Sequence, residues 1–161
     1  TIREKLGTWE DKKVGFIGDG NNNMSRSWMW AAKYTGFEFV VAAPKSCLPP
    51  QDFIDHLDAP NVVLTTDPAA AAKNADVINT DVWLSMGQEG QDEKEALFGN
   101  YQVNENLLSH CAPNHIVLHC LPAYRGKEIS EETLEAHANT IFQQAENRLH
   151  AQKAVLATLV E

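Results

Sequence analysis

Short apolar runs alternate with amphipathic segments along most of this chain. Runs rich in β-branched and aromatic residues, bounded by glycine, proline or polar residues, predict buried strands over 13–18, 38–43, 61–66, 76–80 and 116–119. Apolar residues at helical spacing between these runs predict helices over 24–35, 51–57, 67–74 and 104–110. The alternation predicts an α/β fold, a doubly wound, Rossmann-like sheet of about five mainly parallel strands flanked by helices.

The two ends of the chain carry weaker patterns. A helix end is predicted over 1–6, closed by Gly7, and another helix is predicted to start after Ser130. A short strand is predicted at 140–142 and a final helix over 146–160.

The polar, acidic segment 88–100 contains glycines and predicts a mobile loop with a short helix, which suits a lid over a site.

Composition narrows the class of protein. A length of 161 residues fits one domain with a real core, so residues 1–161 are predicted to form a single domain. A formal net charge of −9 argues against nucleic acid or an anionic membrane as partner, and no apolar run is long enough to cross a bilayer. Three cysteines without paired spacing favour a reducing, cytoplasmic location and give no sign of a metal site.

The first strand runs into the glycine- and asparagine-rich turn 18–23. This turn resembles a dinucleotide fingerprint, but the third glycine of that pattern would fall at Asn23, and Ala43 and Pro44 stand where the ribose-binding acid is expected. The asparagines can therefore be turn and cap residues, or they can bind a carboxylate or an amino acid.

Polar residues also follow the fourth and fifth strands. Asp81 and Ser85 fall on one side if the strand geometry persists, which suits an ammonium group, although an aspartate here is more commonly a helix cap or turn residue. Cys120 follows His119 directly, and adjacent strand residues point to opposite faces, so a catalytic Cys–His couple is not expected. Cys120 is interpreted as a shaping or proton-handling group near an amine, and His119 as a satisfied buried histidine.

Two arginines are candidates for binding an anion near the strand ends. Arg148 lies in the last helix and Arg125 follows the fifth strand. Either arginine can instead form an ordinary surface ion pair.

Four motifs in this order resemble the second, ornithine-binding domain of the ornithine carbamoyltransferases. They are Gly-Asp-Gly-Asn-Asn-Asn at 18–23, Asp-Val-Trp-Leu-Ser-Met-Gly-Gln-Glu at 81–89, His-Cys-Leu-Pro-Ala-Tyr-Arg-Gly at 119–126 and Ala-Glu-Asn-Arg at 145–148. Ser-Met-Gly together with His-Cys-Leu-Pro is typical of the ornithine-using members. The resemblance implies transfer of a carbamoyl group from carbamoyl phosphate to the δ-amine of L-ornithine, without metal or cofactor.

The resemblance also implies roles for individual residues. Asn23 and the Met86 backbone would hold the ornithine α-carboxylate, and Asp81 and Ser85 its α-ammonium. The resemblance further implies that the Cys120 and Leu121 carbonyls bind the carbamoyl amide, that the Cys120 thiol lies near the reacting amine, and that Arg148 polarises the carbamoyl oxygen and helps to hold the phosphate.

The motif by which this family grips phosphate is missing from the chain. The resemblance places it in an N-terminal, carbamoyl phosphate-binding domain, with residues 1–6 as the remnant of the interdomain helix. The chain is therefore expected to be inactive alone, and the full-length enzyme to be a homotrimer. Two alternatives stay open: a carbamoyltransferase for another amine or amino acid, and a non-catalytic amino-acid-binding module.

Overall fold

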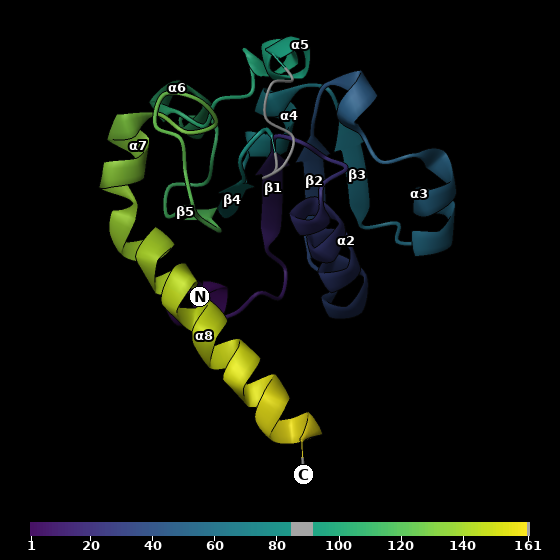
Figure 1. The fold of residues 1–161 in the computed structure, drawn as a ribbon, viewed down its shortest axis with the longest axis vertical. Coiled ribbons are helices and arrows are strands. Elements are labelled where there is room, and N and C mark those ends of the chain that lie inside the picture. The colour runs from purple at the N-terminus through teal and green to yellow at the C-terminus, as the bar shows by residue number, and fades with distance from the viewer. Residues whose placement is uncertain (85–91, 161) are drawn as a thin grey trace.

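A computed structural model of the chain describes residues 1–84 and 92–160 (Figure 1). Its sheet contains β1 (Lys13–Ile17), β2 (Glu38–Ala42), β3 (Val62–Thr65), β4 (Val77–Thr80) and β5 (Ile116–His119). The helices are α1 (Ile2–Leu6), α2 (Asn23–Thr35), α3 (Gln51–Leu57), α4 (Pro68–Ala72), α5 (Asp92–Glu95), α6 (Glu105–Leu108), α7 (Glu131–Ala136) and α8 (Ala138–Leu159), with 3₁₀ helices η1 (Lys45–Cys47) and η2 (Ala96–Phe98).

The five strands form one parallel sheet in the order β3-β2-β1-β4-β5. The predicted α/β, doubly wound fold is confirmed. The chain winds outward from β1 to β3 and then returns to the other side of β1, so the strand order reverses between β1 and β4. Ligands of open α/β sheets bind outside the carboxyl ends of the strands at such a reversal.

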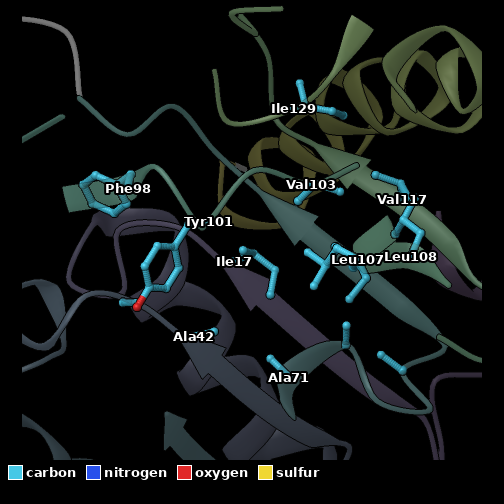
Figure 2. Packing of buried hydrophobic residues seen from close by; sticks show 14 of the residues in the cluster. Ile17, Ala42, Ala71, Phe98, Tyr101, Val103, Leu107, Leu108, Val117 and Ile129 are labelled. Atoms are coloured by element: carbon cyan, nitrogen blue, oxygen red, sulfur yellow. The ribbon is translucent and has the colours of Figure 1, made fainter. Parts of the chain in front are cut away.

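Helices cover both faces of the sheet, and a separate apolar cluster fills each interface. The residues of α2 and α3 pack on one face, against Phe16 and Phe39. On the other face, α4, α6 and η2 contribute to a cluster in which Figure 2 labels Ile17, Ala42, Ala71, Phe98, Tyr101, Val103, Leu107, Leu108, Val117 and Ile129. Apart from the edge strand β3, the strands are mostly buried. Parallel strands buried on both faces read as continuous apolar runs, which explains why these strand predictions hold.

The last part of the chain differs from its prediction. Residues 140–142 are not a strand, because α8 begins at Ala138 and runs through them. The His137 carbonyl already accepts hydrogen bonds from the Thr140 and Ile141 N–H groups, and Ile141 is the only buried residue in this helix. An isolated Thr-Ile-Phe run cannot distinguish a strand from a helix that buries a single one of these residues.

The second half of α8 extends away from the sheet (Figure 1). Every residue from Arg148 to Val160 is exposed, including Leu156 at 60% and Leu159 at 76%. Among the described residues, no helix combines the length and apolar character needed to cross a bilayer.

Candidate functional site

The strand register brings three polar segments together at the carboxyl edge of the sheet. Ile17 of β1 is in register with Thr80 of β4, and Thr80 is in register with His119 of β5. The residues that follow these three, Gly18, Asp81 and Cys120, therefore lie side by side where the strand order reverses. The register therefore brings the residues that follow three different strands to one place.

Asp81 lies at the centre of this site and is only 8% exposed. Its Oδ1 accepts a hydrogen bond from the Cys120 thiol at 3.0 Å, and its Oδ2 accepts one from Asn22 Nδ2 at 3.2 Å. The same Oδ1 also accepts the N–H of Val82 at 2.8 Å. A nearly buried carboxylate with such partners can bind a cation.

Asn22 is the residue of the asparagine run that contacts Asp81. It is 7% exposed and is the N-cap of α2, where its Oδ1 accepts the Ser25 N–H at 2.8 Å. With its side-chain oxygen committed to the helix, its amide nitrogen is left to reach Asp81. Asn23 is exposed, in the first turn of α2. The helix starts one residue earlier than predicted, and placing the N-cap correctly would have identified Asn22.

Gly18 and Gly20 allow the turn after β1 to lie this close to β2 and β4. Gly18 has φ 142°, a conformation that residues with a side chain rarely adopt. A Cβ added to Gly20 would stand 2.9 Å from Val41 Cγ1 and 3.2 Å from the Cys47 carbonyl oxygen. Asp19 in the same turn forms an ion pair with Lys94 Nζ at 2.7 Å, which joins α5 to the site.

Cys120 carries a protonated thiol. Burial, followed by the hydrogen bond to the Asp81 carboxylate and its negative charge, raises the pKa of this thiol to about 12, while the positive charge of Arg148 opposes the shift. Thiolates, not thiols, are nucleophiles, so Cys120 at neutral pH is a hydrogen-bond donor.

Cys120 is followed by a leucine in an unusual backbone conformation. Leu121 has φ 53°, and the peptide bond from Leu121 to Pro122 is cis. The Leu121 N–H donates to His119 Nδ1 at 2.9 Å. His119 is fully buried, as the interpretation of a satisfied histidine expects, and its Nε2 lies 3.1 Å from Glu128 Oε1.

The two arginine candidates differ in their surroundings. Arg125 forms a surface ion pair with Glu135 at 2.7 Å, which is the ordinary alternative for this residue. Arg148 is exposed on α8, one turn after Gln144, whose Oε1 accepts the His119 N–H at 2.9 Å. The Arg148 side chain has no hydrogen-bond or ion-pair partner within residues 1–84 and 92–160.

Two of the predicted site residues, Ser85 and Met86, lie outside the described residues. The predicted short helix of the 88–100 segment is present as α5, residues 88–91 lie outside the described residues, and the lid stays a prediction.

One group within the described part of the chain has potential metal ligands. Asp81, His119 and Cys120 offer atoms that lie within 4.8 Å of one another. The Cys120 thiol already donates to Asp81, and His119 Nδ1 already accepts the Leu121 N–H. These atoms are therefore already engaged in separate internal hydrogen bonds and do not point to a metal centre.

Comparison with known proteins agrees with this geometry. Residues 10–159 match the sequence model of the family described as aspartate/ornithine carbamoyltransferase, Asp/Orn binding domain. An ornithine carbamoyltransferase of Akkermansia muciniphila is 62% identical over 156 residues, which are 96% of this chain and 51% of that protein. A Campylobacter fetus ornithine carbamoyltransferase is 49% identical over 151 residues, 89% of this chain and 48% of that protein.

Solved structures show the same relationship. The crystal structure of an anabolic ornithine carbamoyltransferase from Campylobacter jejuni superposes with a TM-score of 0.91 at 37% identity, covering 98% of this chain and 55% of that one. The ornithine carbamoyltransferase from Pyrococcus furiosus superposes with a TM-score of 0.86 at 44% identity, covering 97% of this chain and 52% of that one. The chain spans about half the length of these relatives.

Proposed function

The chain belongs to the aspartate/ornithine carbamoyltransferase family, as its Asp/Orn-binding domain, and we propose on this premise that it is the ornithine-binding half of an ornithine carbamoyltransferase. The proposed reaction belongs to arginine metabolism and needs no cofactor. The δ-amine of L-ornithine attacks the carbamoyl carbon, its C–N bond forms, the bond from that carbon to the phosphate oxygen breaks, and the amine loses a proton. The products are citrulline and phosphate.

The observation that carries the proposal is the position of the Asp81 carboxylate. It is nearly buried, it lies at the reversal of the strand order, and amide and thiol donors surround it. An amino acid brings both an ammonium and a carboxylate to such a place. In the proposed complex, Asp81 and Ser85 bind the α-ammonium, while Asn23 and the Met86 backbone bind the α-carboxylate.

Cys120 acts in this proposal as a neutral group. Because its pKa is raised to about 12, the thiol keeps its proton at pH 7 and forms no covalent intermediate. It lies beside the reacting amine, and the carbonyls of Cys120 and Leu121 accept hydrogen bonds from the carbamoyl amide. Catalysis then depends on orienting the two substrates and excluding water.

Arg148 supplies the positive charge. Its exposed guanidinium lies close enough to Cys120 to oppose the rise in the pKa of that thiol. In the proposed mechanism it polarises the carbamoyl oxygen, stabilises the oxyanion that forms after attack, and helps to hold the phosphate. Much of the phosphate site would come from a carbamoyl phosphate-binding domain, because the chain spans only about half of its relatives.

The test is citrulline formation from carbamoyl phosphate, measured with the 161-residue chain alone and with the whole protein that carries it. We expect turnover by the whole protein and none by the 161-residue chain alone. We also expect the whole protein to be a homotrimer. L-Aspartate and putrescine are the comparison substrates. Preference for either would favour a related carbamoyltransferase, and ornithine binding without any turnover would favour an amino-acid-binding module.

A further inference from the structure

The turn after β5 holds a leucine in the left-handed region of backbone space. Leu121 has φ 53°, a conformation that is unfavourable for a residue with a side chain. This turn also sets the position of the Cys120 thiol that reaches Asp81. Something must therefore hold Leu121 in this conformation.

His119 provides that restraint through a defined tautomer. Its Nδ1 accepts the Leu121 N–H at 2.9 Å, so the ring proton must lie on Nε2. Nε2 is 3.1 Å from Glu128 Oε1 and donates to it. The same carboxylate oxygen accepts the Tyr124 N–H at 2.7 Å. Glu128 therefore ties together the two ends of the loop 119–128 and its middle.

Stability alone does not explain this arrangement. Both side chains are fully buried, and Glu128 Oε2 has no hydrogen-bond partner among the described residues. A buried carboxylate with an unpartnered oxygen costs free energy, and well-packed apolar residues of similar volume are often at least as stabilising. The pair therefore points to a role in fixing geometry.

We propose that His119 and Glu128 are positioning residues that hold Leu121 in its left-handed conformation, so that the Cys120 thiol and the carbonyls of Cys120 and Leu121 face the carbamoyl group. The role rests on the proposed function, because it concerns the turn that meets the carbamoyl amide. Neither residue touches a substrate. Glu128 selects the tautomer of His119, and His119 restrains the backbone of Leu121.

Two substitutions at one position separate this role from simple packing. Asparagine accepts a hydrogen bond from the backbone N–H two residues later, so His119→Asn keeps the restraint on Leu121 while losing the contact with Glu128. Glutamine is one carbon longer and does not favour that turn, but its amide can still donate to Glu128. His119→Gln therefore keeps the buried contact and loses the restraint.

The readout is citrulline formation by the whole protein that carries this chain. We expect His119→Asn to stay within about tenfold of the parent kcat, and His119→Gln to lose about a hundredfold, the effect of misplacing a reacting group by about 1 Å. KM for L-ornithine should change little in either variant, because the α-groups bind elsewhere. Amide hydrogen exchange at Leu121 should be slow in the parent and in His119→Asn, and fast in His119→Gln.

The outcomes are distinguishable. Equal kcat for the two variants beside an active parent, or losses that simply follow their melting temperatures, would overturn the positioning role alone. A parent that makes no citrulline would overturn the proposed function and this role together. In that case the ¹⁵N shifts of the His119 ring, expected to show the tautomer with its proton on Nε2, still report whether the turn is built as described.

Discussion

The turns after β1 and β5 meet at the same carboxylate but are built differently. Asn22 from the first turn donates to Asp81 Oδ2, and Cys120 from the second donates to Oδ1. Each turn contains a residue with positive φ, which is Gly18 in the first and Leu121 in the second. Glycine adopts this conformation without support, whereas leucine is held by the buried His119 and Glu128.

This difference shows two ways of holding a backbone against a ligand. A glycine turn lets neighbouring strands approach closely, and the residue with positive φ needs no side chain to hold it there. A leucine turn with a buried histidine keeps its carbonyls in fixed directions. We expect the second kind where atoms must be aimed at a reacting group, and the first where space is the main requirement.

Removing the support of the second turn should have the largest effect. Glu128→Leu leaves the His119 Nε2–H and the Tyr124 N–H without an acceptor, and should lower the free energy of unfolding by about 2–5 kcal/mol in urea. Glu135→Gln, at an exposed surface ion pair, is the control and should leave the free energy of unfolding almost unchanged. Similar effects from the two variants would show that Glu128 does not support the turn.

The meeting point of the turns can be tested through the Cys120 thiol. Because its pKa is raised from 9.0 to about 12, alkylation at pH 8 should be slower than for a free thiol by roughly a hundredfold or more. Asp81→Asn removes the negative charge and should accelerate the reaction at Cys120, read by peptide mass spectrometry. Cys111, whose pKa burial raises to about 11 without Asp81, is the internal control and should not change.

The raised pKa of Cys120 also makes the free energy of unfolding depend on pH. The folded state keeps the Cys120 proton more tightly than the unfolded state, so the stabilisation is present below pH 9 and is lost as pH rises toward 12. In the alkylation experiment above, faster reaction of both Cys120 and Cys111 in Asp81→Asn would instead indicate general loosening of the fold.

Adding a side chain to the first turn should lower the free energy of unfolding more than removing one from the second turn. Gly18→Ala should cost about 1–3 kcal/mol of unfolding free energy, because φ 142° is unfavourable for alanine. The new Cβ meets no atom closer than 3.7 Å, so the cost comes from the backbone and not from a clash.

The reciprocal change in the second turn should be the smallest effect. Leu121→Gly relieves roughly 1–2 kcal/mol of left-handed strain, and glycine offsets part of this by losing more backbone entropy on folding. The melting temperature should stay close to the parent value by calorimetry. A large loss would mean that Leu121 contributes mainly by packing, since it contacts the apolar cluster on that face.

The sequence reveals the strands well, because parallel strands buried on both faces are continuous apolar runs such as 116–119. It does not reveal the strand order, which depends on long-range pairing. The 140–142 run was too short to be recognised as part of a helix, and that prediction was wrong.

The candidate site was only partly predictable for similar reasons. Asp81 and Cys120 stand out because each ends a strand, but nothing local says that their side chains touch. Asn22 was missed by one residue at a helix start, where boundaries are least certain. The contact between His119 and Glu128 joins residues nine positions apart across an irregular loop, where no periodic pattern signals it.

The most direct test of the central claim is whether Asp81 recognises the α-ammonium of ornithine. Citrulline-type product formation is measured with L-ornithine and with 5-aminopentanoate, which lacks that ammonium, in the whole protein and in its Asp81→Asn variant. The parent should prefer L-ornithine in kcat/KM by about a hundredfold or more, as expected for a buried charge pair worth 2–5 kcal/mol, and the variant should lose most of that preference. A variant that still discriminates as strongly as the parent would contradict the account.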